Sequence, residues 1–373
     1  MNTPARRVVG GLEGVVVGQT RLSRVDGQAG RLTLAGFAVE TLAPAVSFES
    51  ALFLLWHDRL PTPSEHDRVR AELAEARRLP AEVLQVVRAA AKRGAPAMNA
   101  LRLGVAALGL TAPSDVRLVG AMAAMLATYV RHPNEVVEVP PEVDHATALL
   151  WMLHGRRPTD TEARALTTYL VTVCDHGMNA STFAARVVAS TGSDDAAAIE
   201  AALGALAGPL HGGAPGPALE ALLALRDRAP TTLEAATVAW VEEQVAQGER
   251  IMGFGHRVYR VRDPRADVLA AAAKALLADS SLLADAQVHE RAVLATLSRL
   301  KPDRPIATNV EYYTALLLHG LGIASDLFTA VFAVGRVAGW TAHIAEQRAT
   351  GRLIRPRVEY IGPFDRSVAA ATR

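Results

Sequence analysis

The chain has 373 residues, of which 50% are hydrophobic and 21% are charged, a balance typical of a globular protein with more than one packed lobe. Its formal net charge of +1 provides no overall attraction to nucleic acid or to an anionic membrane surface, so neither is expected as a partner. The single cysteine, Cys174, excludes an internal disulfide framework and, among apolar neighbours, is expected to be a small buried side chain.

The longest apolar stretch of the chain, residues 314–340, is interrupted by His319, Asp326 and Arg336. Because a membrane span needs ~20 consecutive apolar residues, we expect this stretch to form buried helices, and we expect no membrane association. Residues 1–10 carry two arginines and no apolar segment of the secretory type, which favours a cytoplasmic protein.

The first predicted element is a β-hairpin near the N-terminus. Val15–Val17 and Arg31–Leu34 contain strand-forming residues and lie on either side of Asp26-Gly27, a dipeptide suited to a tight hairpin turn. From Ser47 onward, alanine is abundant and apolar residues recur at helical spacing, which favours helix. The sequence therefore predicts an almost all-α protein with a small β element at its start.

Two later helices have marked boundaries. Thr231 and Glu234 have the spacing of a capping box, and Gly248 suits the end of the same helix. Asp263 and Pro264 suit the N-cap and the first position of the next helix.

A first candidate for chemistry is His211, which lies in the segment Gly208–Ala214 between a proline and paired glycines. This composition indicates a tight turn leading into a helix, where helix-terminal N–H groups would lower the pKa of the imidazole. A neutral imidazole could then donate a hydrogen bond to a developing oxyanion. From this segment alone, a histidine that only caps its own turn is an equally good interpretation.

A second candidate segment, Ile251–Tyr259, has two glycines on either side of an aromatic residue. Such a loop lets a ligand approach its backbone closely. The basic residues His256, Arg257 and, further along, Arg265 favour binding of carboxylate or phosphate groups. A glycine-rich linker with solvated basic residues is the alternative interpretation.

A third candidate segment extends from residue 305 to residue 362. Glu311 lies between apolar and aromatic neighbours, so its carboxylate should be partly desolvated and more basic than usual. Arg336 follows an apolar stretch, and a buried guanidinium needs an anion. That anion could be a substrate carboxylate or an internal carboxylate such as Glu346.

Metal chemistry has little support in the sequence. His343 and Glu346 have the i, i+3 spacing of half a helical metal site, but a second such pair and further ligands do not follow, so no metal is expected. The sequence also contains no dinucleotide-binding, Walker or nucleophile-elbow motif.

Several segments together resemble the signature stretches of the citrate synthase family, and the resemblance covers nearly the whole chain. These segments are Gly11–Val16, Asp175–Thr182, Gly208–Ala214, Gly253–Tyr259 with Asp263–Arg265, and Gly339–His343 through Arg355-Pro356. Each match alone is weak, whereas their order and spacing together are highly specific.

The resemblance implies an all-α, two-domain fold that works as a homodimer. By this analogy, residues 1–210 and 317–373 form a large helical domain that mediates dimerisation. Residues 211–316 form a small helical domain that closes over the substrates. The active site would lie in the cleft between the domains, with Arg355 reaching into the site of the other subunit.

The family's site residues are carried over onto the matching positions of this sequence. His211 would hydrogen-bond the enolate oxygen, Glu311 would remove the α-proton of the thioester, and His256 would protonate the ketone oxygen. The implied ligands of oxaloacetate are His176, Arg265, Arg336 and Arg355, and those of CoA are Gly253, Gly255 and Arg257.

The implied reaction is condensation of acetyl-CoA with oxaloacetate and hydrolysis to citrate and CoA, with no cofactor beyond the CoA thioester. The family has aspartate where this chain has Glu311, and a shift of about an ångström in the carboxylate can cost ~10²-fold in rate. Two further functions therefore stay open. One is a 2-methylcitrate synthase that takes propionyl-CoA, and the other is a weakly active paralogue that acts as a binding or regulatory protein.

Overall fold

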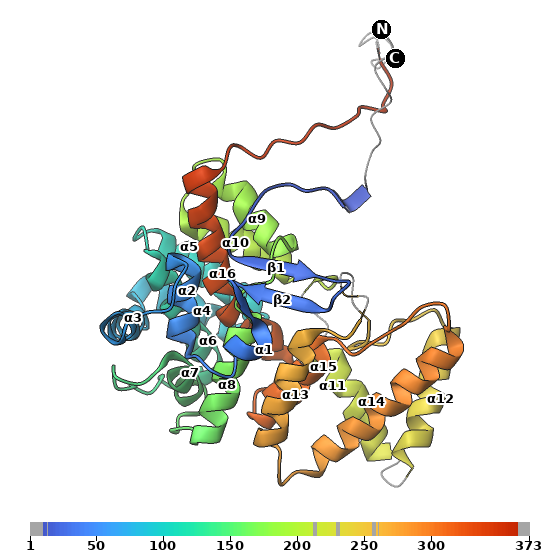
Figure 1. Ribbon diagram of the computed structural model, residues 1–373. Helices are drawn as coiled ribbons and strands as arrows, with labels where there is room; N and C mark the ends of the chain where they lie inside the picture. Colours follow the sequence, from blue (N-terminus) through green and yellow to red (C-terminus); the bar gives the residue numbers. More distant parts are fainter. Residues whose placement is uncertain are drawn as a thin grey trace, which may run out of the picture.

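The computed structural model describes residues 10–12, 14–211, 215–228, 232–255, 259 and 261–364. This part of the chain contains sixteen α-helices and one three-stranded antiparallel sheet near the N-terminus (Figure 1). Two short 3-10 helices, Gly10–Leu12 and Ser325–Leu327, complete the regular structure there. The predicted fold class, all-α with a small β element at the start, is confirmed.

The first ten helices follow the sheet along the chain. They are α1 (Val39–Leu42), α2 (Phe48–His57), α3 (Pro63–Ala76), α4 (Ala81–Lys92), α5 (Ala97–Gly109), α6 (Asp115–Arg131), α7 (His145–His154), α8 (Asp160–Val173), α9 (Ala180–Ala189) and α10 (Asp195–Leu206). The remaining six are α11 (Pro215–Arg228), α12 (Leu233–Ala246), α13 (Pro264–Leu276), α14 (Ser281–Leu300), α15 (Val310–Gly320) and α16 (Phe328–Thr350).

The sheet corrects one detail of the predicted hairpin. Its strands are β1 (Ser23–Asp26), β2 (Arg31–Leu34) and β3 (Phe37–Ala38), in that order and antiparallel. The turn at Asp26 is confirmed, because Asp26 pairs with Arg31 and its Oδ1 accepts from the Ala29 amide at 2.9 Å. The expected strand at Val15–Val17 is wrong: the structure shows no strand there, because the short turn after Asp26 places residues 23–26 opposite β2 with a smaller loop-closure cost.

The predicted helix boundaries are largely found. Asp263 is the N-cap of α13, with Pro264 at its first position, as predicted. Gly248 lies just after the end of α12 with φ of +78°, a conformation that glycine adopts without strain. Thr231, the proposed capping residue of α12, lies outside the described residues. The N-cap of α12 is Thr232, whose side chain makes no capping bond.

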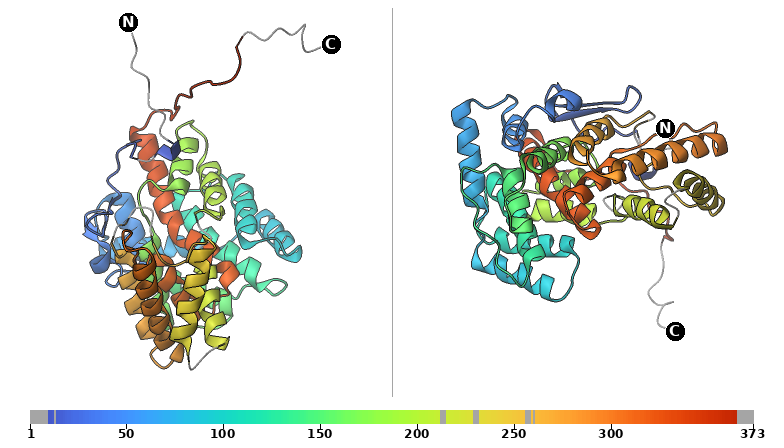
Figure 2. Two further views of the ribbon diagram at one scale, coloured as in Figure 1. Left: turned by 90° about the vertical axis from the view of Figure 1, so that its right-hand side faces the viewer. Right: turned by 90° about the horizontal axis from the view of Figure 1, so that it is seen from below.

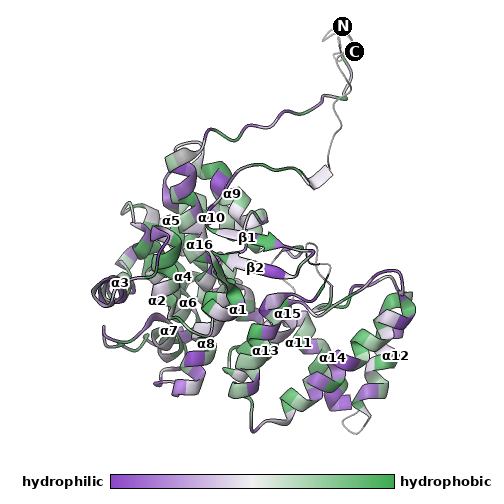
Figure 3. Ribbon diagram, viewed as in Figure 1, coloured by the Kyte–Doolittle hydropathy of each residue, from purple (hydrophilic) through white to green (hydrophobic). Residues whose placement is uncertain are grey.

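Helix α16 is the central helix of the larger helical group. It packs against α2, α5, α6, α8, α9 and α10. Together with the preceding 3-10 helix, it forms a helical stretch, Ser325–Ala349, that is long and apolar enough to cross a membrane. In the most apolar 18 residues of this stretch, however, 83% are buried inside the protein, as expected of a core helix. Figure 3 shows hydrophobic residues gathered in the helices around α16, whereas the peripheral α3 is largely hydrophilic.

A second group of helices, α11 to α14, stands to one side of the first (Figures 1 and 2). Within it, α12 packs against α14, and a small hydrophobic cluster separate from the main core is formed by Val241, Ile251, Val293 and Leu297. Helices α13 and α15 pack together, and α13 also packs against α8 of the larger group. The expected domain boundaries at residues 211 and 316 stay a prediction.

Candidate active site

His211 lies in the turn after α10, and the N-terminus of α9 contacts its ring. Its Nε2 accepts a hydrogen bond from the Ser181 amide at 3.3 Å and lies 2.9 Å from Ser181 Oγ. Because Nε2 is the acceptor, the ring proton is on Nδ1. Burial, together with the positive charge of Arg336, lowers the pKa of His211 to about 4. The imidazole is therefore neutral near pH 7 and presents an Nδ1–H donor.

The hydroxyl of Ser181 is itself fixed from two sides. Its one proton is shared between two acceptors, Asn179 Oδ1 at 2.7 Å and His211 Nε2 at 2.9 Å, and its oxygen accepts from Trp340 Nε1 at 3.2 Å. Asn179 is the N-cap of α9, and its side chain accepts from the amides of Ser181 and Thr182. These bonds fix the Ser181 backbone amide, which donates to His211 Nε2 and so keeps the ring proton on Nδ1. The segment Gly208–Ala214 predicted that the helix after His211 supplies such N–H groups, whereas α9 supplies them.

Glu311 is the second residue of α15, and its amide donates to Oδ1 of the N-cap Asn309 at 3.0 Å. Burial raises the pKa of its carboxyl to about 7, although the nearby Arg265 acts in the opposite direction. Asp263 adds to the increase through charge repulsion. A carboxylate with this pKa is suited to removing a weakly acidic proton near neutral pH.

Arg265 lies in the first turn of α13 and is almost fully buried. Its guanidinium donates to both carboxylate oxygens of Asp263, with Nε–Oδ1 at 3.1 Å and Nη2–Oδ2 at 2.8 Å. Asp263 Oδ2 also accepts from the Val310 amide at 3.3 Å. One carboxylate thus connects Arg265 to the start of the helix that carries Glu311.

Arg336 lies on α16 with only 2% of its surface exposed. Its Nε donates to the Val173 carbonyl at 2.6 Å, and its guanidinium lies 4.5 Å from the centre of the Phe332 ring. Glu346, the example considered as an internal partner, pairs instead with Arg186 at 2.7 Å, whereas the internal carboxylate of Asp175 acts on Arg336 through its charge. Among the described residues no carboxylate forms an ion pair with Arg336, and burial lowers its pKa to about 10. A buried cation of this kind favours an anionic ligand.

His176 follows α8 in the loop that leads to α9. Its Nε2 lies 3.1 Å from the hydroxyl of Tyr259, and the two rings meet edge to face with centroids 5.7 Å apart. Tyr259 in turn lies under the Arg265 guanidinium, 6.0 Å from the ring centre. His176 and Arg265 are therefore brought close together by one aromatic side chain.

Gly253 and Gly255 lie in a loop held against the segment before α15. The Gly255 amide donates to the Ala307 carbonyl at 2.7 Å, and the Asn309 amide donates to the Gly253 carbonyl at 3.0 Å. Gly253 has φ of +86°, and a Cβ there would lie 3.1 Å from the Tyr312 ring. Only glycine fits this position without strain. His256 and Arg257, the remaining expected residues of this loop, lie outside the described residues.

Comparison with known proteins identifies the family. A family model described as citrate synthase, C-terminal domain, matches residues 11–357. The chain belongs to the citrate synthase family. A citrate synthase of Haloferax volcanii is 40% identical over 372 residues, covering 95% of this chain and 96% of that protein. A 2-methylcitrate synthase of Shewanella oneidensis is 32% identical over 377 residues, covering 98% of each chain.

Solved structures of citrate synthases share this fold. That of the Pyrobaculum aerophilum citrate synthase has a TM-score of 0.87 at 32% identity, covering 98% of this chain and 95% of that one. A ternary complex of the Thermoplasma acidophilum citrate synthase with carboxymethyl coenzyme A and oxaloacetate has a TM-score of 0.87 at 30% identity, covering 98% and 99%. The chain is thus an enzyme, a condensing transferase of the citrate synthase family.

In this citrate synthase family member, Arg355 is separated from the other candidate residues. It is exposed and lies in the extended segment that follows α16, which runs away from the body of the chain (Figure 1). Its neighbour Ile354 donates its amide to Ser190 Oγ, after the end of α9, at 3.0 Å, and Arg355 itself forms no hydrogen bond or ion pair with the other described candidates. The other described candidates, His176, His211, Arg265, Glu311 and Arg336, are linked by the contacts and charge interactions given above.

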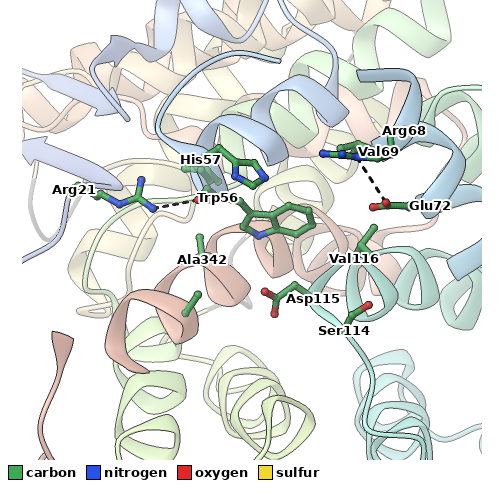
Figure 4. A pocket seen from close by; sticks show the side chains of 12 residues that line it. Arg21, Trp56, His57, Arg68, Val69, Glu72, Ser114, Asp115, Val116 and Ala342 are labelled. Carbon is green, nitrogen blue, oxygen red and sulfur yellow. Dashed lines mark hydrogen bonds and ion pairs between the residues drawn. The ribbon is translucent and has the colours of Figure 1, made fainter. Parts of the chain in front are cut away.

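A separate hollow of about 460 Å³ lies on the large helical group of this citrate synthase family member. It is lined by the end of α2, by α3, by the start of α6 and by α16, and Trp56 and Asp115 face it (Figure 4). Burial, with the charge of Asp195, raises the pKa of Asp115 to about 6. None of the described candidate catalytic residues lines this hollow, so we place the active site elsewhere.

The sequence alone predicted no role for Ser181 and only a helix-capping role for Asp263. Ser181 lies inside one of the segments that resemble the family, Asp175–Thr182, but its contact with Trp340 joins residues 159 positions apart. Asp263 was recognisable as an N-cap, whereas its bonds to Arg265 and Val310 required the packing of α13 against α15. The position of Asp263 directly before Pro264 was the only local signal for the contacts of these two residues.

Proposed function

We propose that this chain condenses acetyl-CoA with oxaloacetate and hydrolyses the product to citrate and CoA. Glu311 removes a proton from the methyl carbon of the thioester, and the electron pair moves onto the thioester oxygen as an enolate. The enolate carbon then attacks the ketone carbon of oxaloacetate, and His256 gives a proton to the ketone oxygen. Water cleaves the resulting thioester, which releases citrate and free CoA.

The observation that carries this proposal is the opposite pKa shift of two groups that are linked through the charges of Arg336 and Arg265. Burial raises the pKa of Glu311 to about 7 and lowers that of His211 to about 4. A base that is active near neutral pH and a neutral hydrogen-bond donor are the two groups that enolate formation needs. The Nδ1–H of His211 would stabilise the enolate oxygen as Glu311 takes the proton.

The cationic residues support a dicarboxylate as the second substrate. Arg265 and Arg336 are buried, and His176 lies near Arg265 through Tyr259. The Thermoplasma acidophilum relative was crystallised with oxaloacetate and carboxymethyl coenzyme A. We propose that these three residues bind oxaloacetate here.

The fourth oxaloacetate ligand in this proposal is Arg355 of a second copy. The extended segment after α16 carries several exposed large apolar side chains: Leu353, Val358, Tyr360, Ile361 and Phe364. Large exposed apolar surface on one segment favours contact with another protein surface. The active form would be a homodimer, located in the cytoplasm.

The CoA thioester would bind at the loop that contains Gly253 and Gly255. Both glycines have positive φ, a conformation that only glycine adopts readily, so this loop has a backbone course that other residues would not allow. Arg257 would meet a phosphate of CoA.

We propose that neither a metal nor a further cofactor takes part in the reaction. Overnight dialysis of the protein against EDTA should therefore leave the rate of CoA release unchanged.

A second candidate function is 2-methylcitrate synthesis from propionyl-CoA. The Shewanella oneidensis relative with this name covers the full length of the chain. Acetyl-CoA and propionyl-CoA differ by one methylene, which changes the binding free energy in a pocket by only ~1–3 kcal/mol.

A third candidate function is that of a weakly active binding or regulatory protein. It rests on the presence of Glu311 where the family has aspartate.

The test is release of free CoA thiol by purified protein supplied with oxaloacetate and either acetyl-CoA or propionyl-CoA. We expect turnover of ~1–10³ per second with acetyl-CoA, the usual range for enzymes. A faster reaction with propionyl-CoA would identify the second function instead. No release above background by folded protein that still binds oxaloacetate would favour the third.

A further inference from the structure

One face of α16 holds the segment that precedes His176. Three successive residues of that segment are bound in order by three residues of the helix: the Val173 carbonyl by Arg336 Nε at 2.6 Å, the Cys174 carbonyl by the Gly339 amide at 3.0 Å, and the Asp175 carboxylate by His343 Nε2 at 3.1 Å. The spacing of 336, 339 and 343 places all three on the same side of a helix. His176 is the next residue after the bound segment.

The close approach of the two segments depends on Gly339. A Cβ at this position would lie 2.3 Å from the Cys174 carbonyl oxygen and 2.7 Å from Asp175 Oδ1. Both distances are shorter than any real contact, so a side chain here would push the loop away from α16. The two backbones are therefore in direct contact next to His176.

The neighbours of His343 determine which of its ring nitrogens donates. Arg186 Nη1 lies 3.1 Å from His343 Nδ1, and an arginine can only donate. Nδ1 is therefore the acceptor, and the proton on Nε2 is donated to Asp175 Oδ1. The side chains of His343 and Asp175 are fully buried, so water does not compete for this bond.

The second oxygen of Asp175 is also bound. Oδ2 accepts from the hydroxyl of Ser23, on β1, and from the Gly177 amide at 3.2 Å. The Gly177 amide also donates to Ser23 Oγ at 2.8 Å. Asp175 is thus fixed by α16 on one side and by the sheet on the other, and the backbone is held on both sides of His176.

We propose that Asp175 and His343 are positioning residues, which fix the loop so that His176 and Arg336 present their side chains to the dicarboxylate at a set separation. Neither residue would contact the substrate. This inference rests on the proposed function of His176 and Arg336 as oxaloacetate ligands. Helix α16 would then have two functions: it carries one ligand, Arg336, and through His343 it supports the loop that carries the second ligand, His176.

The test replaces His343 by leucine and by glutamine. Leucine fills a similar volume and removes the bond to Asp175. Glutamine restores it, because an amide can donate to Asp175 and accept from Arg186. We expect H343L to raise the KM for oxaloacetate about tenfold or more, because small displacements of binding groups are costly, with the KM for acyl-CoA within about twofold. H343Q should recover most of this loss.

A matched control is available in His145. This histidine is also fully buried in the larger helical group, and neither ring nitrogen has a hydrogen-bond partner among the described residues. H145L should leave both KM values unchanged, even where its melting temperature changes as much as that of H343L. A purely structural role of His343 would make the two leucine variants alike in their kinetics.

Calorimetric titration of oxaloacetate into each variant separates two kinds of failure. If the wild type neither binds oxaloacetate nor releases CoA, the proposed function fails and this inference falls with it. If the wild type is active and H343L keeps its oxaloacetate KM, or raises both KM values equally, only the positioning role is refuted.

If H343L does not fold, a second variant, S23A, removes the hydrogen bond from Ser23 to the other oxygen of Asp175. We expect S23A to raise the oxaloacetate KM about threefold, as for a lost hydrogen bond, and an unchanged KM would refute the positioning role.

Discussion

Glu311 and Glu82 occupy the same position in their helices, the second residue of α15 and of α4, but their surroundings differ. Glu82 is exposed, whereas Glu311 is largely buried beside Arg265. We expect E311Q to lower kcat by about 10²–10⁴-fold, the usual contribution of a general base. E311D should lower it by about tenfold, since the shorter side chain withdraws the carboxylate from a site built around glutamate.

The same two substitutions at Glu82 provide the control, because they change the same side chain at the same helix position away from the site. Steady-state CoA release measures all four variants. An E311D enzyme faster than the wild type would contradict adaptation to glutamate and would indicate a weakened natural enzyme.

The pKa of Glu311 predicts how the rate changes with pH. The base must be ionised, so kcat/KM should increase about tenfold per pH unit up to a pH of about 7 and then level off. His211 must be neutral, which with a pKa of about 4 it is throughout this range. Of these two groups, only Glu311 therefore titrates near pH 7. An inflection near the ordinary carboxyl pKa of ~4.3 would exclude Glu311 as the base.

At the scale of elements, the loop containing Gly253 and Gly255 is joined to α15 by backbone bonds. G253A adds a Cβ only 3.1 Å from the Tyr312 ring, so the loop has to move. We expect the KM for acyl-CoA to increase several-fold and kcat to decrease, because the same displacement reaches Glu311 through Asn309. Steady-state kinetics with varied acyl-CoA measures both effects.

Gly248 provides a matched control for this substitution. It also has positive φ, at +78°, but a Cβ there would meet no atom within 4 Å. G248A therefore tests the backbone strain alone, which costs about 1 kcal/mol of stability. Equal kinetic effects from the two alanines would mean that the contact with Tyr312 has no functional importance.

The elements that could be predicted from the sequence are those with local signals. The N-cap at Asp263 and the turn at Asp26 depend on residues within a few positions of one another, and both were found. The strand expected at Val15–Val17 failed because strand propensity does not determine the pairing partner. The N–H donor to His211 comes from α9, and local sequence does not indicate which helix packs there.

At the scale of the whole molecule, the proposed homodimer predicts that Arg355 acts in the site of the other subunit. We expect R355Q and E311Q each to be nearly inactive alone. In a mixed dimer, the site with an intact Glu311 receives an intact Arg355 from the other subunit. Refolding the two variants together in equal amounts should restore about a quarter of wild-type activity, because half of the dimers are mixed and one of their two sites is complete.

Size-exclusion chromatography of the same mixture controls for assembly. Recovery of activity only in the dimer fraction is the expected result. If no activity returns although mixed dimers form, then Arg355 acts in its own subunit or not at all. This experiment therefore also tests the proposed homodimer.

The candidate site itself was predictable in part. Glu311 and Arg336 were identified as charged residues among apolar neighbours and Arg265 as part of a cationic segment, and the structure buries both arginines and partly buries Glu311. The pairing of Arg336 with Glu346 could not be decided from sequence, because Arg186 approaches Glu346 from a helix 160 residues away. Connections of this length depend on packing, which the sequence does not display locally.

The single carboxylate of Asp263 has a consequence for how this enzyme can change over generations. It bonds to Arg265 and to the amide that begins α15, so a mutation there would alter the proposed ligand of one substrate and the proposed base acting on the other at once. Selection for a new acid or a new thioester cannot proceed through this residue independently. Adaptation to other substrates would have to accumulate at positions around it, while Asp263 itself stays fixed.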